Sequence, residues 1–115
     1  MKRHHISFKH AWDGILHNLK TQPNFRVHLF IGSLTILAGY YFRLAAWEWL
    51  ILIFTITLVL IAEMINTAIE SMVDLLTSEH RKHAKIAKDT SAGMVLVTAL
   101  SSIIVGVIIF IPHLL

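Results

Sequence analysis

Three carboxylates and one amide recur at helical spacing in the middle of the chain. On a helix that turns about 100° per residue, they fall within an arc of roughly 80°: Glu63, Asn66, Glu70 and Asp74. An ionisable side chain within a membrane is costly and usually marks a functional site. Oxygen atoms in such a row suit a general base, a proton carrier or a hard cation such as Mg²⁺.

The polar stripe also has a purely structural explanation. Asn66, and Thr67 beside it, are residue types that pack membrane helices together by hydrogen bonds. Three carboxylates in register are harder to explain in this way, so the stripe favours a functional interpretation.

A charged segment follows the stripe directly, over residues 77–89. Its Lys and Arg side chains could receive phosphate oxygens, although a basic loop on the cytoplasmic side of a membrane has the same composition. The chain has neither a Walker A loop nor a G-x-G-x-x-G motif. A nucleotide would therefore need an unconventional site.

Composition places these residues in a membrane protein. The chain has 115 residues, of which 56% are hydrophobic and 15% charged, against about 45–50% and about 25% in soluble domains. The absence of cysteine excludes a disulfide scaffold, a thiolate zinc site and a Cys nucleophile. A nucleic-acid partner is not expected, because such proteins carry a basic face on a soluble core.

Blocks without fixed charge divide the chain into spans. The apolar blocks are Val27–Phe42, Trp49–Ala62 and Thr90–Leu115. Since a spanning helix needs roughly 20 mostly apolar residues, we predict an all-α integral membrane protein with one membrane domain over residues 1–115. The predicted transmembrane helices are 24–43, 47–76 and 89–112.

The first 22 residues predict an amphipathic helix on the membrane surface. Apolar side chains recur there at helical spacing, with polar ones between them: Phe8, Trp12, Ile15, Leu16 and Leu19. A basic tail without fixed structure is the alternative.

Nine Lys and Arg lie before the first span or after the second, and one lies elsewhere. The N-terminus and the second loop are therefore predicted to be cytoplasmic, and the C-terminus outside.

Depth along the second span separates the carboxylates. If Trp47 or Trp49 marks the outer interface, about 20 residues cross ~30 Å of hydrocarbon, and the inner boundary lies near residues 67–69. Glu63 would then sit just inside the apolar layer. Glu70 lies about 10 Å further along the axis, at the inner edge.

These residues resemble a known family. The run Glu63-x-x-Asn66-Thr-Ala-Ile-Glu70-x-x-x-Asp74, with Ala-Lys88-Asp89 and Gly93 after it, is similar to the prokaryotic diacylglycerol kinase and undecaprenol kinase family. The similarity covers nearly the whole chain. The Asn24-Phe-Arg start of the first span looks more like the Gram-positive branch, for which undecaprenol is the expected main substrate.

The resemblance implies a homotrimeric lipid kinase of the bacterial cell membrane that uses ATP and Mg²⁺, with active sites at the cytoplasmic surface between subunits. It implies that Glu63 is the base for the lipid hydroxyl, that Asn66 places the hydroxyl or the γ-phosphate, and that Glu70 binds Mg²⁺ between the ATP phosphates. The residues implied to contact ATP are Glu70, Glu79, His80, Arg81, Lys88 and Asp89, with His10 a weaker candidate. Asp74 belongs to the motif without an assigned role.

One position departs from the family pattern. A second metal ligand, usually Glu, stands three residues before the Phe of the first span, and here it is Gln22. A neutral amide coordinates Mg²⁺ more weakly than a carboxylate does.

Two other functions remain open on the sequence. A small proton-coupled transporter could use Glu63 as its proton carrier, but transport sites lie near the midplane, and these carboxylates lie toward the cytoplasmic end. A non-catalytic subunit packed by its polar stripe would leave the Lys- and Asp-rich segment unexplained.

Overall fold

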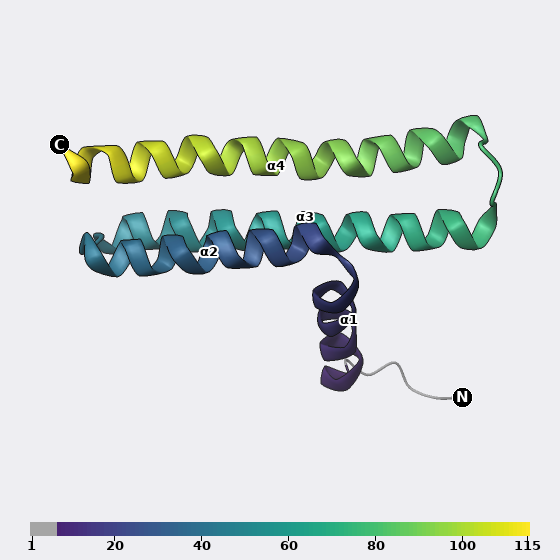
Figure 1. Cartoon of the computed structure of the whole chain (residues 1–115), viewed down its shortest axis with the longest axis horizontal. Helices are drawn as coiled ribbons and strands as arrows, with labels where there is room; N and C mark the ends of the chain where they lie inside the picture. Colours follow the sequence, from purple (N-terminus) through teal and green to yellow (C-terminus); the bar gives the residue numbers. More distant parts are fainter. Residues whose placement is uncertain (1–6) are drawn as a thin grey trace.

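The computed structural model describes residues 7–115, so the first six residues of the predicted surface helix lie outside it. All the regular secondary structure in this range is α-helical, as predicted. The four helices are α1 (Phe8–Thr21), α2 (Pro23–Tyr41), α3 (Ala46–Leu76) and α4 (Lys82–Leu114) (Figure 1).

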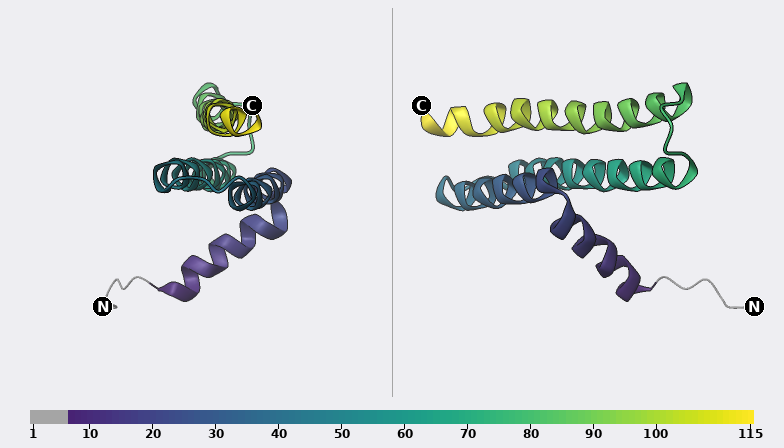
Figure 2. Two further views of the ribbon diagram at one scale, coloured as in Figure 1. Left: turned by 90° about the vertical axis from the view of Figure 1, so that its left-hand side faces the viewer. Right: turned by 45° about the vertical axis from the view of Figure 1, so that its right-hand side comes forward.

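Local sequence explains the break between the first two helices. Ser7 caps α1, because its hydroxyl accepts a hydrogen bond from the backbone N–H of His10. Pro23 occupies the first position of α2, where its missing N–H costs nothing. The chain turns sharply at Gln22, so α1 runs across the direction of the other helices (Figures 1 and 2).

The turn from α2 to α3 is a Schellman motif. The N–H of Leu44 bonds the carbonyl of Gly39, and the N–H of Arg43 bonds that of Tyr40. Arg43 has a φ of 55°, in the left-handed region where glycine is preferred. Gly39 also allows Trp49 to approach closely, since a Cβ at this position would lie 2.7 Å from the indole.

Helix α3 packs against both of the other long helices. Seen end-on, α2 and α3 run side by side, α4 covers them, and α1 extends away on the opposite face (Figure 2). A core cluster joins the α2–α3 turn to α3 and α4 through Leu44, Leu52 and Ile109, with Phe42 packed against them. α3 and α4 continue well past the start of α2 toward their connecting loop (Figure 1).

Two of the helices, α3 and α4, are long and apolar enough to cross a membrane. Large apolar side chains cover their outward faces, as expected for surfaces that meet lipid or another subunit. Helix α2, which corresponds to the first of the three predicted spans, has 19 residues and is not one of these two helices.

Helix bounds agree with the predicted spans except at one end. α2 and α3 begin and end within two residues of the predicted ranges 24–43 and 47–76. α4 begins at Lys82, seven residues before the predicted span 89–112, so only Thr77–Arg81 is non-helical in the charged segment. The helix continues into this segment because Lys and Ala are good helix formers and Lys85 pairs with Asp89 one turn later.

Candidate active site

Glu63 is a buried carboxylate with one unpaired oxygen. Its side chain is 3% exposed, and its Oε1 has no hydrogen-bond partner among residues 7–115. The nearest ionisable group is His28 of α2, whose Nε2 lies 3.4 Å from that oxygen. A carboxylate oxygen without a donor is available to accept a proton from a substrate hydroxyl.

One turn further along α3, Thr67 connects α3 to α1. Its hydroxyl lies 2.8 Å from Asn18 Oδ1 of α1 and 3.0 Å from the backbone carbonyl of Glu63. Asn18 is itself buried, and its amide donates to the carbonyl of Gly14. This contact holds α1 against α3 one helical turn from Glu63.

Asn66 turns toward α4 and links two helices. Its Nδ2 donates to Glu70 Oε1 at 2.6 Å, and the hydroxyl of Ser91 donates to its Oδ1 at 2.7 Å. Glu70 is exposed at the inner end of this group, where polar ligands have access to it.

The ends of α3 and α4 that meet at their connecting segment carry a second, charged group. Lys88 donates to Asp74 Oδ1 at 2.7 Å across the two helices, and this hydrogen bond raises the pKa of Lys88. Beside the pair lies a cavity of about 260 Å³, which is lined by ten residues: Val73, Asp74, Thr77, Ser78, Glu79, His80, Ala84, Lys85, Lys88 and Asp89. Arg81 borders it through a 3.2 Å ion pair with Glu79.

The fold therefore brings most of the predicted site residues into two adjoining groups on α3 and α4. His10 and Gln22 are outside both. Within the described chain, neither side chain forms a hydrogen bond to α3 or α4; Gln22 donates to its neighbour Thr21. Figure 1 shows the reason, since α1 projects away from α4.

Three contributors were not predicted from the sequence. His28 stands near the start of an apolar block, and Asn18 follows an amphipathic pattern that marks it only as polar. Ser91 is one of several small residues along α4, and it is 1% exposed. The contact of Ser91 with Asn66 depends on how α4 packs against α3, so the sequence does not predict it.

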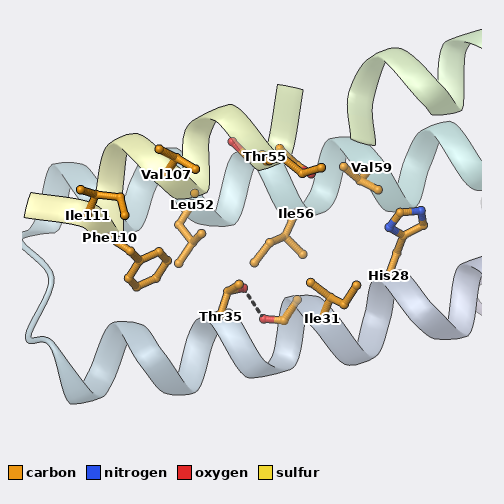
Figure 3. Close-up of a pocket in the computed structure, with 14 residues that line it drawn as sticks. His28, Ile31, Thr35, Leu52, Thr55, Ile56, Val59, Val107, Phe110 and Ile111 are labelled. Carbon is orange, nitrogen blue, oxygen red and sulfur yellow. Dashed lines mark hydrogen bonds between the residues drawn. The ribbon is translucent and has the colours of Figure 1, made fainter. Parts of the chain in front are cut away.

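An apolar groove begins beside Glu63. It lies between α2 and α4 over the face of α3, has a volume of about 400 Å³, and has His28 at one end and Phe110 and Ile111 at the other (Figure 3). Its hydroxyl-bearing residues bond carbonyls of their own helices: Thr35, Thr55 and Ser102. The groove is therefore suited to hydrocarbon.

The opposite end of the bundle has a separate acid–histidine pair. His113 of α4 lies 2.9 Å from Glu48 of α3, whose other oxygen accepts the backbone N–H of Ala45. This pair joins the ends of two helices away from the Glu63 group.

The donor set fits Mg²⁺ bound together with a nucleotide. Within residues 7–115, no cluster of three or more His, Asp or Glu could hold a metal by protein ligands alone. Mg²⁺ usually takes one or two carboxylates, with phosphates and waters completing the octahedron. Glu70, fixed by Asn66, supplies such a carboxylate.

The sequence pattern of the prokaryotic diacylglycerol kinase family matches residues 9–110. The chain belongs to this family. It is 43% identical over 111 residues to a diacylglycerol kinase of Synechocystis sp. and 40% identical over 114 residues to an undecaprenol kinase of Bacillus subtilis. These alignments cover 96% and 99% of the chain.

The two relatives differ in how much of their own length is matched. The chain spans 63% of the Synechocystis protein and 93% of the Bacillus protein. Membership of the prokaryotic diacylglycerol kinase family and both relatives' names confirm the predicted enzyme class, a lipid kinase.

Proposed function

We propose that this protein is an ATP-dependent kinase of a membrane lipid alcohol. Its main substrate would be undecaprenol, converted to undecaprenyl phosphate, and its second substrate diacylglycerol, converted to phosphatidate. The order of preference is supported by the match to almost the full length of an undecaprenol kinase.

One observation carries the proposal: buried Glu63 stands at the apolar end of a row of polar side chains that leads to exposed Glu70. The Oε1 of Glu63 accepts no hydrogen bond from residues 7–115 and lies 3.4 Å from His28 Nε2. A lipid hydroxyl and a nucleotide arrive from different phases. Glu63 lies where the hydroxyl would be, and Glu70, about 10 Å further along the helix, lies where phosphates could arrive from water.

The chemistry requires positioning and charge neutralisation. The lipid oxygen attacks the γ-phosphorus, its proton passes to Glu63, and the bond to the bridging oxygen breaks so that ADP leaves. Asn66 would orient the hydroxyl or the γ-phosphate. Glu70 would hold Mg²⁺, whose charge neutralises the phosphates.

We place ATP at the charged cavity between α3 and α4. Lys88, Arg81 and His80 can donate to phosphate oxygens. Glu79 and Asp89 can accept hydrogen bonds from the nucleotide. Asp74 would hold Lys88 in place, a role that the 2.7 Å contact supports.

Self-association as a homotrimer would complete this site. His10 and Gln22 form no bond to α3 or α4 of their own chain. In the proposed trimer, they would approach the nucleotide and Mg²⁺ of a neighbouring subunit. The extensive apolar surface of α2 and α4 supports burial between subunits as well as in lipid.

We further propose that α2, α3 and α4 all span the bacterial cell membrane. The 19 residues of α2 extend for about 28 Å, close to the thickness of the hydrocarbon layer. Lys and Arg would then place the N-terminus and the active site on the cytoplasmic side and the C-terminus outside. α1, which runs across the bundle, would lie on the inner surface.

The apolar groove would hold the hydrocarbon chain of the lipid. His28 belongs both to the groove and to the surroundings of Glu63. The groove extends from there toward the outer end of the bundle. A lipid whose hydroxyl is at Glu63 would direct its chain along this path.

The proposal is tested with purified protein in lipid vesicles, ATP labelled at the γ-phosphate, and undecaprenol or diacylglycerol. We expect label in both lipids, faster in undecaprenol, and loss of transfer when Mg²⁺ is removed with a chelator. Failure to label either lipid would rule out the kinase and leave proton-coupled transport to be measured in the same vesicles.

A further inference from the structure

Ser91 is the most completely buried residue of the described chain, and it lies beside the polar stripe of Glu63, Asn66, Glu70 and Asp74. It is 1% exposed, and its hydroxyl is 2.7 Å from Asn66 Oδ1 on the facing helix. It is also 3.0 Å from the carbonyl of Lys88 on its own helix. A hydroxyl has one proton, so these two acceptors compete for it.

The neighbouring carboxylate decides the orientation of the amide. Glu70, when ionised, can only accept hydrogen bonds, so the atom of Asn66 at 2.6 Å from it must be the Nδ2 donor. The amide oxygen then faces Ser91, which must supply the proton. The result is a directional chain that runs from the Ser91 hydroxyl to the Asn66 oxygen, and from the Asn66 NH₂ to the Glu70 carboxylate.

We propose that Ser91 is a positioning residue of the phosphoryl-transfer site, which fixes the Asn66 amide and through it the Glu70 carboxylate. The inference rests on the proposed kinase function. The chain of bonds occupies Oε1 of Glu70. Because the residue is exposed, its other oxygen could meet a metal–nucleotide complex.

Loss of the hydroxyl removes this constraint. In Ser91→Ala, Asn66 Oδ1 has no donor from α4, so the amide rotates more freely and Glu70 samples additional orientations. A hydrogen bond of this kind corresponds to about a two- to tenfold change in an equilibrium or rate. We expect kcat and the apparent affinity for Mg²⁺ to fall by such a factor, with the KM for lipid unchanged.

A matched control exists on the same helix. The hydroxyl of Thr98 donates to the carbonyl of Val95, three residues earlier, as Ser91 can toward Lys88, but within residues 7–115 it forms no hydrogen bond to another helix. Thr98→Val therefore removes a half-buried hydroxyl of α4 without changing Ser91, Asn66 or Glu70. Ser91→Cys preserves the size and a weak donor, and should fall between Ser91 and Ser91→Ala.

The first measurement does not depend on turnover. The chain has three asparagines, Asn18, Asn24 and Asn66, so selective ¹⁵N-Asn labelling in nanodiscs gives few side-chain amide signals. We expect the Asn66 NH₂ pair to shift or broaden in Ser91→Ala, partly in Ser91→Cys, and not in Thr98→Val. The Asn18 pair serves as an internal reference for correct folding.

The second measurement is the kinetic one, with Mg²⁺ titrated at fixed ATP. Asn66 amide signals in Ser91→Ala that match those of Thr98→Val would overturn the inference, as would equal Mg²⁺ dependence in the two variants. If Ser91→Ala does not fold, the same comparison is made with Ser91→Cys. An inactive wild-type protein would instead overturn the proposed function, and the amide signals would still test the bonding chain.

Discussion

The contact between Thr67 and Asn18 predicts how firmly the surface helix is held. Thr67→Val replaces the hydroxyl by a methyl group of similar size. The carbonyl of Glu63 keeps its helical partner, so the main loss is the 2.8 Å bond to Asn18 Oδ1. That oxygen is then a buried acceptor without a donor from α3.

The magnitude follows from the burial of the acceptor. Asn18 is 5% exposed, and an unpaired buried acceptor costs about 1–3 kcal/mol. This energy favours local opening of α1, because opening returns the oxygen to water. Opening should become about fivefold to about 150-fold more frequent. Arg26, which donates to the carbonyls of Leu19 and Lys20, keeps the end of α1 attached.

Amide hydrogen exchange in nanodiscs measures this opening. We expect faster exchange over residues 8–17 in Thr67→Val and unchanged exchange in the middle of α4. Thr55→Val is the control, since Thr55 bonds only the carbonyl of Ile51 on its own helix. Replacing both partners, as in Asn18→Leu with Thr67→Val, should recover part of the protection. Equal exchange of α1 in Thr67→Val and Thr55→Val would refute the reasoning.

Three further substitutions have defined outcomes. Arg43→Gly relieves a left-handed residue and should raise the free energy of unfolding by about 0.5–1 kcal/mol, measured by denaturant titration in detergent. Gly39→Ala places a Cβ 2.7 Å from Trp49 and should lower the free energy of unfolding by about 1–3 kcal/mol in the same assay. Gln22→Glu should lower the Mg²⁺ concentration needed for half-maximal transfer; an unchanged requirement would exclude position 22 as a metal ligand.

The helices were predictable from the sequence because their signals are local. Apolar blocks define the cores of α2 and α3, and Pro23 marks a helix start. α4 begins before the predicted span 89–112, because charge indicates where an apolar layer ends, whereas helix formation depends on propensity and on pairs such as Lys85 with Asp89.

The site was predictable along one helix and not between helices. The spacing of Glu63 and Glu70 follows from the helical period alone. The partners of the stripe are Ser91, Asn18 and His28. Whether they meet α3 depends on how each helix is rotated against it. Side-chain packing determines that rotation, and residue spacing does not predict it. The same reason conceals the pair of Glu48 with His113, which are 65 positions apart.

The central claim is that Glu63 takes the proton of the lipid hydroxyl. The direct measurement is kcat for phosphate transfer from ATP to undecaprenol by Glu63→Gln, compared with Glu48→Gln, which changes the other buried glutamate of α3. We predict a loss of about 10²–10⁴-fold for Glu63→Gln, as for removal of a general base, and turnover close to wild type per folded Glu48→Gln protein. Near-normal turnover by Glu63→Gln would contradict the assignment.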